Sequence, residues 1–371
     1  MKIKEVTNYL EEIAPLQFQE SYDNSGLIIG DRESIITSVL VCIDSTEEVV
    51  DEAIKNGCNL IIAHHPIIFS GIKQLTGKNH IERVVIKAIQ NNISIYVIHT
   101  NLDNVLGGVN TKIADLIGLK NYQILSPKKE LLRKLVVYVP KDNVDELEQT
   151  LFNAGAGKIG NYQNCSFKSL GTGTFLANKN ANPTVGSIGS QETVDEVKLE
   201  VVFTKNIENT LIDEMKKTHP YEEISYQIYV LENTFNHVGS GVFGDLDTEM
   251  SSLDFLKNLK SKMKTDCIRH TKLVKKSIKR VAICGGSGAF LLNKAKLVNS
   301  DIFISSDFKY HDFFNSENEI IIADIGHYES EQFTKELIYD MLVNNFSKFA
   351  VQLSKVNTNP IKYLYNGKKN N

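Results

Sequence analysis

The sequence predicts an α/β protein whose core consists of two α/β halves around mainly parallel sheets, interrupted by an inserted α+β domain. Short apolar strands alternate with amphipathic helices in residues 1–126 and again in residues 236–371. Residues 127–235, between these halves, follow a different order of strands and helices. The length of 371 residues is ample for two or three domains with a substantial buried core.

The first half contains three predicted strands, each followed by a predicted helix. The strand at residues 38–45 leads into a helix for which Thr46 is a suitable N-cap and Gly57 a suitable C-terminal residue. Two further strand–helix pairs follow, at residues 59–66 and 81–92 and at residues 94–100 and 109–119. This alternation favours a largely parallel sheet covered by helices on both faces.

The inserted segment has the order strand, helix, two or more strands, helix, strand. Its first strand is predicted at residues 134–140 and its last at residues 223–231. This β-α-β-β-α-β order is the ferredoxin-like pattern. The glycine-rich stretches 155–160 and 171–173 lack phosphate-loop spacing, so we expect tight turns at both.

The second half returns to alternating strands and helices after residue 236. Apolar strands are predicted at residues 280–288, 301–307 and 320–327, and a long amphipathic helix at residues 331–346. The polar tail, residues 355–371, is expected to be partly loose.

Composition and charge exclude several classes of function and location. The net charge of −4 and the lack of a basic aromatic stripe argue against nucleic-acid binding. No apolar run reaches the ~18 residues that span a bilayer, and the amino terminus lacks the apolar core of a signal peptide. The five cysteines are odd in number and form no CxxC pair, which favours a reducing compartment. We therefore expect a cytoplasmic protein that binds neither membranes nor nucleic acid.

Candidate metal ligands lie directly after predicted strands, where open α/β sheets place their sites. His64-His65-Pro66 ends one strand, and the proline lets both imidazoles turn towards two ions about 3.5–4 Å apart. Asp103 follows the next strand and suits a hard or borderline divalent ion. His99 is either a ligand or a hydrogen-bond partner that orients one, and we favour the second role. The alternative for the paired histidines is that one is packed and the other exposed.

The second half supplies two further candidates, His327 and Glu331, at the end of its last strand. If helical geometry begins here, the two side chains share one helix face. If it begins only at Glu331, the carboxylate still lies at a helix start, where the dipole favours negative charge. A carboxylate has two oxygens and can bridge two cations. Asp103 and Glu331 remove two units of positive charge, and the remaining charge would acidify a bound water.

Asp307 and His311 follow the strand at residues 301–307 and are the candidate catalytic residues. The functional interpretation is a rim that handles substrate or transfers a proton, and the alternative is a structural ion pair. On the insert, His219 follows a helix and begins the motif His-Pro-Tyr-Glu-Glu. It either caps that helix or belongs to a ligand pocket.

Seven motifs occur together and in order: YDNSGLIIG at 22–30, VCIDSTEEVVDEAI at 41–54, IIAHHP at 61–66, IHTNLDNVLGGVN at 98–110, VAICGGSGA at 281–289, DIFISSDFKYHDFF at 301–314 and IADIGHYESE at 322–331. With these motifs the chain resembles the NIF-three-like proteins, a family whose members are often called GTP cyclohydrolase 1 type 2 homologs. The motifs span both halves of the predicted core.

The resemblance implies a dinuclear metal site in which His64, His65, Asp103 and His327 are terminal ligands and Glu331 is the bridging carboxylate. It implies two divalent ions per chain. Among these zinc is favoured, and Mn, Fe or Co also suit mixed imidazole and carboxylate ligands. The resemblance further implies a PII-like or CutA-like insert and a homo-oligomer in the form of a hexameric toroid.

The resemblance also frames two functional hypotheses. The first is a metal-dependent hydrolase that acts on a nucleotide or another phosphate-bearing substrate, although the sequence has neither an NKxD motif nor a phosphate loop. The second is a non-catalytic metal-binding regulatory or scaffold protein whose insert senses a small molecule or docks a partner. The chain departs from the family where Tyr22 replaces a frequent tryptophan and where Ser305-Ser306 replaces a frequent Thr-Gly.

Overall fold

The structure is a computed structural model that describes residues 1–364, and its contacts divide the chain into two compact units. One unit combines residues 1–127 with the chain from residue 236 onward, and the other is formed by residues 128–235. Within the described residues, no helix has both the length and the apolar character needed to cross a membrane.

The first unit contains a five-stranded sheet in the order β1-β4-β3-β2-β15. Strands β2, β3 and β4 pair in parallel, β15 adds in parallel to β2, and β1 is an antiparallel edge strand. The last strand of the chain therefore completes the sheet of the first half. The strands are β1 (Gly26–Ile29), β2 (Ser38–Cys42), β3 (Leu60–Ala63), β4 (Ser94–Val97) and β15 (Ala350–Leu353).

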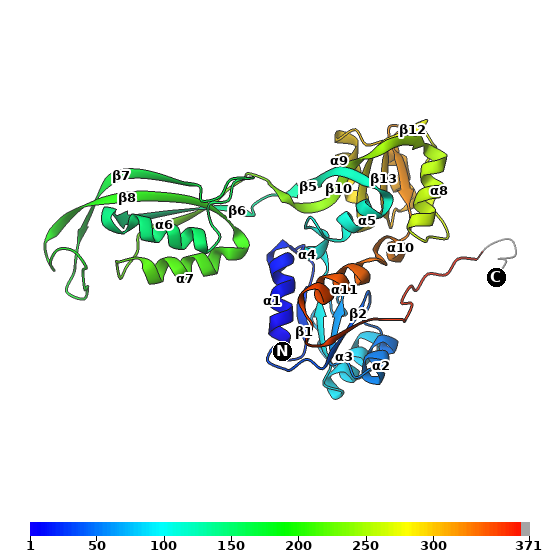
Figure 1. The fold of residues 1–371 in the computed structure, drawn as a ribbon, viewed down its shortest axis with the longest axis horizontal. Coiled ribbons are helices and arrows are strands. Elements are labelled where there is room, and N and C mark those ends of the chain that lie inside the picture. Colours follow the sequence, from blue (N-terminus) through cyan, green and yellow to red (C-terminus); the bar gives the residue numbers. More distant parts are fainter. Residues whose placement is uncertain (365–371) are drawn as a thin grey trace. The chain divides into compact units, whose positions relative to one another are not determined.

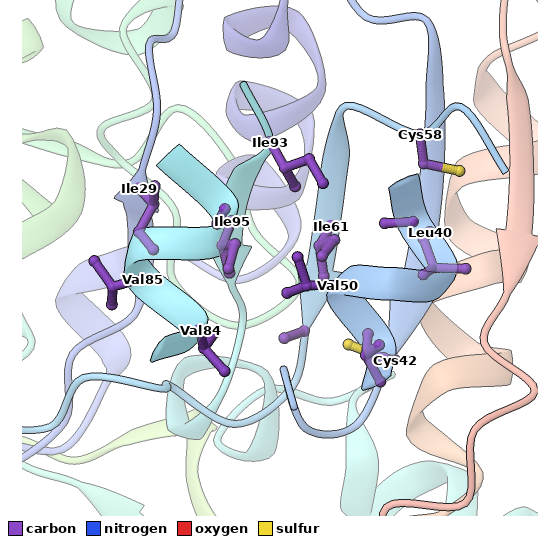
Figure 2. Close-up of a cluster of buried hydrophobic side chains, with 14 of the residues drawn as sticks. Ile29, Leu40, Cys42, Val50, Cys58, Ile61, Val84, Val85, Ile93 and Ile95 are labelled. Atoms are coloured by element: carbon purple, nitrogen blue, oxygen red, sulfur yellow. The ribbon is translucent and has the colours of Figure 1, made fainter. Parts of the chain in front are cut away.

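Helices cover this sheet on both faces, as the strand–helix alternation predicts. Helices α2 (Glu47–Lys55) and α3 (His80–Gln90) pack on one face, and α11 (Thr334–Asn345) contacts β2 and β15 (Figure 1). Thr46 accepts a hydrogen bond from the Val49 amide and is the predicted N-cap of α2. Figure 2 shows the apolar core between α2, α3 and the sheet, in which every labelled side chain is at most 7% exposed. Each fully buried aliphatic side chain contributes about 1.5–3 kcal/mol to this packing.

A second sheet in the same unit has six strands in the order β11-β14-β13-β12-β10-β5. Its strands β12, β13 and β14 are parallel, whereas β10 is antiparallel to β12 and β11 is antiparallel to β14. Both sheets are therefore mixed. The first is mainly parallel, as expected, whereas in the second the parallel pairing holds for β12, β13 and β14. The strands are β5 (Leu119–Lys128), β10 (Phe235–Ser251), β11 (Arg269–His270), β12 (Ser277–Ser287), β13 (Ile302–Ser306) and β14 (Ile321–Asp324).

Among the described residues, the first unit contains further α-helices and three short 3-10 helices. The helix predicted at residues 331–346 corresponds to α11, which begins at Thr334, and a separate short helix, α10, precedes it from His327 to Glu331. The α-helices are α1 (Ile3–Ile13), α4 (Thr100–Asp103), α5 (Val109–Ile117), α8 (Ser252–Lys262), α9 (Leu292–Leu297) and α10 (His327–Glu331). The 3-10 helices are η1 (Leu16–Phe18), η4 (Ala289–Leu291) and η5 (Tyr310–Ser316).

Residues 354–359, which include the start of the tail predicted to be partly loose, are hydrogen-bonded to the core. After β15, Ser354 donates to Glu52 over 2.6 Å and Asn359 donates to Glu329 over 3.1 Å. Thr358 donates a hydrogen bond to Asp44. The contacts of Ser354 and Thr358 join positions 302 and 314 residues apart in sequence, so local composition did not indicate them. Residues 365–371 of the predicted tail lie outside the described residues.

The second unit has the element order β6-α6-β7-β8-α7-β9, as expected for the insert. Its four strands form an antiparallel sheet in the order β7-β8-β6-β9, with α6 and α7 on one face (Figure 1). Residues 155–160 contain positive-φ glycines and form the expected turn, but residues 171–173 lie inside β7. The elements are β6 (Leu132–Pro140), η2 (Lys141–Asn143), α6 (Val144–Asn153), β7 (Ser166–Leu176), β8 (Gln191–Thr204), η3 (Lys205–Ile207), α7 (Glu208–Thr218) and β9 (Tyr226–Val230).

Candidate metal centre

The carboxyl ends of strands from both sheets of the first unit bring the predicted ligands together. His64 and His65 follow β3, and Asp103 ends the short helix α4 after β4. His327 and Glu331 are the first and last residues of α10, which follows β14. Residues up to 267 positions apart thus meet at one place, as parallel strand ends allow.

Glu331 is the centre of this cluster. Its side chain is 3% exposed, and its Oε2 atom lies 2.8 Å from His65 Nε2 and 3.1 Å from His327 Nε2. His64 Nε2 lies 3.9 Å from the same oxygen. Burial alone would raise the pKa of Glu331, but the charges of His327 and His65 hold it well below its usual value. Three imidazoles therefore converge on one ionised carboxylate.

His64 and Asp103 present unsatisfied ligand atoms to the cluster. The His64 side chain is fully buried, and its Nδ1 is hydrogen-bonded to the Ile98 carbonyl over 2.9 Å. Neither His64 Nε2 nor Asp103 Oδ1 has a hydrogen-bond partner in residues 1–364, although the two atoms are only 3.7 Å apart. Buried polar atoms are almost always satisfied, and 3.7 Å is too long for a hydrogen bond. A cation between the two atoms would satisfy both, so the donor set fits a metal ion.

Carboxylates contact the Nδ1 atoms of His65 and His327, on the side of each ring away from Glu331. His65 Nδ1 lies 2.8 Å from Asp44 Oδ1, and His327 Nδ1 lies 2.6 Å from Asp307 Oδ2. A carboxylate on one ring nitrogen fixes the tautomer and directs the lone pair of the other nitrogen outward, which is the usual arrangement around a metal-bound histidine. Thr358 donates to the second oxygen of Asp44 and so ties the carboxy-terminal segment to the same chain of contacts.

His99 lies with the paired histidines rather than behind them. One ring nitrogen each from His64, His65 and His99 lie within 4.8 Å of one another. His99 Nδ1 is 2.7 Å from Asp23 Oδ1, and Asp23 is fully buried. Burial opposes ionisation of Asp23, but the hydrogen bond from His99 lowers its pKa overall. The geometry therefore favours His99 as a ligand and Asp23 as its orienting partner, whereas the sequence favoured the orienting role for His99.

The cluster strongly favours positive charge. Burial by itself would lower the pKa of His65, yet the carboxylates of Glu331 and Asp44 raise it to about 10. Burial would likewise lower the pKa of His327, but Glu331 and Asp307 raise it to about 11. The potential that stabilises a proton on each imidazole also stabilises a divalent cation at the same place.

A glycine and two serines shape the wall next to Glu331. Gly286 has a φ of +62°, and a Cβ atom there would lie 2.3 Å from Glu331 Oε1. Its amide donates to Ser330 Oγ over 2.9 Å. Its carbonyl accepts hydrogen bonds from Ser305 over 3.1 Å and Ser306 over 2.5 Å. Ser305 and Ser306 are fully buried and hold this loop, which gives the Ser-Ser departure a positioning role.

The two candidate catalytic residues occupy different places. Asp307, at a φ of +58°, contacts His327 and thus belongs to the candidate ligand cluster as an orienting carboxylate. His311 is exposed on η5, where its ring packs against Tyr310 and Phe314. It does not line the cleft above the cluster, so its part in proton transfer remains a prediction without geometric support.

Sequence reasoning missed Asp44, Asp23, Gly286 and Thr358. Asp44 carried a usable signal, because it follows the parallel strand β2 as His64 follows β3. Asp23 precedes a short edge strand and offered no such signal. Asp324, which lies beside the candidates in sequence, is structural: its carboxylate accepts from the Phe308 and Gly326 amides, each over 3.1 Å, and pairs with Arg269.

The cluster forms the floor of a cleft of about 780 Å³ within the first unit. Three aromatic side chains line it while remaining largely exposed to solvent: Tyr22, Phe69 and Phe290 are 66%, 54% and 69% exposed. The cleft volume lies within the range of small-molecule sites. A ligand that reaches the candidate cluster would therefore also meet aromatic surfaces.

Comparisons with known proteins cover the chain almost completely. The family model described as Duf34/NIF3 (NGG1p interacting factor 3) matches residues 1–360. A GTP cyclohydrolase 1 type 2 homolog of Staphylococcus aureus is 37% identical over 369 residues, which cover 98% of this chain and 100% of the relative. The protein of the same name from Bacillus subtilis is 36% identical over 367 residues, covering 97% and 98%. The crystal structure of a Bacillus cereus protein related to NIF3 gives a TM-score of 0.82 at 33% identity, covering 98% and 99%.

Proposed function

The chain belongs to the Duf34/NIF3 family, and from this premise we propose that it is a hydrolase dependent on two divalent metal ions. The proposed substrate is a nucleotide or another phosphate-bearing compound, since the relatives are named GTP cyclohydrolase 1 type 2 homologs. The proposed ligands are His64, His65, His99, Asp103, His327 and Glu331.

The unsatisfied pair of His64 Nε2 and Asp103 Oδ1 is the observation that carries this proposal. These atoms are buried, face each other across 3.7 Å and have no partner in the described chain. This pair would hold one ion. His65 and His327, whose Nε2 atoms both face Glu331 Oε2, would hold the other, and Glu331 would contribute to both.

Two divalent ions held by these residues would supply Lewis-acid chemistry, which lowers the pKa of water and polarises substrate oxygens. The protein contributes the fixed geometry. Asp44 and Asp307 keep the Nδ1 atoms of His65 and His327 engaged, so that both Nε2 atoms face inward. The buried floor at His64 excludes bulk water from one side of the site, and the cleft admits the substrate from the other.

The ring-bearing part of the substrate would lie against the exposed aromatic side chains of the cleft. Tyr22, Phe69 and Phe290 offer flat apolar surfaces at its lining, and such faces stack on planar rings. The ligand set of imidazoles and carboxylates suits zinc first, with manganese, iron or cobalt as alternatives. By family resemblance we also propose a homohexameric assembly, which a mass measurement in solution tests directly.

The decisive experiment combines metal analysis with a turnover assay. Protein purified without a histidine tag or chelator should contain about two ions per chain, and GTP and simple phosphoesters should be hydrolysed only by the metal-loaded protein. Two ions without turnover of these substrates would favour the alternative, a metal-binding regulatory protein. No stoichiometric metal after reconstitution with Zn, Mn, Fe and Co would refute both.

A further inference from the structure

A second cavity of about 610 Å³ lies entirely within the unit formed by residues 128–235. It contains none of the residues of the metal cluster. Its lining includes both motifs that the metal site leaves unused: the glycines of residues 171–173 and the Tyr-Glu-Glu of the motif that begins at His219. The volume suits a ligand of small-molecule size.

His219 is a buried connector that positions this cavity wall. Its Nε2 lies 2.9 Å from the Tyr138 carbonyl, and its Nδ1 accepts the Tyr221 amide over 3.1 Å. The Tyr221 ring packs against His219, with their centroids 5.2 Å apart. With both nitrogens engaged by the backbone, His219 is no free ligand, and its role is to place Tyr221 in the cavity.

The Tyr221 hydroxyl is buried and makes no hydrogen bond of normal geometry among the residues that the structure describes, although the Glu196 carboxylate is close enough to interact with it. Burial, together with the negative charge of nearby Glu196, raises the pKa of Tyr221 to about 12. An unsatisfied hydroxyl in a cavity wall is costly unless a bound molecule or water forms a hydrogen bond with it. It therefore marks a position where a ligand group would be accepted.

Gly173 makes room for the Glu196 carboxylate in the same wall. A Cβ atom at Gly173 would lie 2.3 Å from Glu196 Oε2, whereas a Cβ atom at Gly171 would meet nothing within 4 Å. Glycine at position 173 therefore leaves space for the carboxylate and does not form a turn. Glycine inside a strand often marks such a close approach.

The loop between β7 and β8 is tied to the motif across the cavity. Asn182 donates its amide to Glu222 over 2.7 Å, and Thr184 donates to the Pro220 carbonyl over 2.8 Å. Pro183, Thr184 and Val185 of this loop line the cavity. The loop is thus held as a wall of the cavity.

The lining combines negative charge with apolar surface. Glu196, Glu222 and Glu223 are the acidic groups, and the one lysine of the lining, Lys198, is paired with Glu200. The half-buried Phe175 ring lines the cavity from the same face of β7 as Gly171, which pairs with Glu196 in β8. We propose that this cavity binds a small organic cation, in which an amine or guanidinium group meets Glu196 and Tyr221 and an apolar body contacts Phe175.

Binding of tyramine to the full chain tests this proposal. Calorimetric titration should show that tyramine binds, and that 4-ethylphenol, which lacks the amine, binds at least tenfold more weakly, a difference of about 1.4 kcal/mol. Glu196→Gln should weaken tyramine binding at least tenfold. Glu146→Gln makes the same charge change on the exposed face of α6 and should leave binding unchanged.

The two glycines provide a matched pair that adds one methyl group each. Gly173→Ala should displace the Glu196 carboxylate and weaken tyramine binding, while Gly171→Ala should have a much smaller effect. Melting curves of every variant establish that it is folded. Equal affinity for tyramine and 4-ethylphenol, or tyramine binding unchanged by Glu196→Gln, would overturn the proposal. So would the absence of tyramine binding to the unmodified chain.

Discussion

Replacing Glu331 with glutamine removes the charge on which the proposed metal centre depends and keeps the size of the side chain. The nitrogens of His65, His327 and His64 lie 2.8, 3.1 and 3.9 Å from Glu331 Oε2. An ion bound by any of them is therefore close to this carboxylate. Because one oxygen faces all three imidazoles, we expect a single substitution to affect both ions.

The magnitude follows from the charges. Two unit charges about 4 Å apart attract each other by about 4 kcal/mol at an effective dielectric constant of about 20, and a divalent ion doubles this to about 8 kcal/mol. Removing the carboxylate also removes the cost of burying it, which offsets much of the loss. If only about a quarter remains, about 2 kcal/mol, affinity for each ion falls about 30-fold.

The assay is elemental mass spectrometry after dialysis, together with competition against a chelator of known affinity. Glu329→Gln is the matched control, since it makes the same change two residues earlier in α10, where the carboxylate accepts from Asn359 over 3.1 Å. We expect Glu331→Gln to lose both ions and Glu329→Gln to retain them. Two tightly held ions in Glu331→Gln would refute the shared-carboxylate arrangement.

Three further predictions concern the same centre. Asp44→Asn removes the carboxylate that holds His65, and we expect chelator competition to show metal affinity lowered about 10- to 100-fold. In the metal-free protein, the pKa values of about 10 for His65 and about 11 for His327 are raised in the folded state, so their protonation stabilises the fold at neutral pH. This contribution is lost as pH rises through those values, and the melting temperature of the metal-free protein should fall accordingly. Gly286→Ala forces a Cβ atom to within 2.3 Å of Glu331 and strains a positive φ by about 1–2 kcal/mol, so denaturant titration and metal analysis should both report losses.

Each of these predictions has its own control. Thr358→Val removes only the outer contact to Asp44 and should lower metal affinity less than Asp44→Asn does. Metal-loaded protein should show a weaker alkaline loss of stability, because bound ions exclude the two protons. Gly107→Ala adds a methyl at a φ of +86° with nothing within 4 Å, so it should reduce stability without reducing metal content. Opposite rankings in any of these pairs would contradict the geometry described.

Sequence reasoning located five of the six proposed ligands but only part of their support. His64, His65, Asp103, His327 and Glu331 stood out because polar groups followed apolar strands, and the structure brings all five together. Which residues are ligands and which only orient them was harder to predict from the sequence. A histidine after a strand has no local feature that distinguishes a ligand from an orienting partner, and the carboxylate behind it comes from a distant segment.

The sequence itself determined the alternation of strands and helices in the core, the element order of residues 128–235 and the N-cap at Thr46. These features follow from local hydrophobic periodicity and capping chemistry. Three features were decided only in the tertiary structure: the addition of β15 to β2, the antiparallel pairing of β1 with β4 and of β10 with β12, and the contacts of Asp23 and Asp44 with His99 and His65. Each of these joins residues far apart in the chain. Such pairings depend on the total burial and hydrogen bonding of the folded molecule, for which no short window of sequence holds the information.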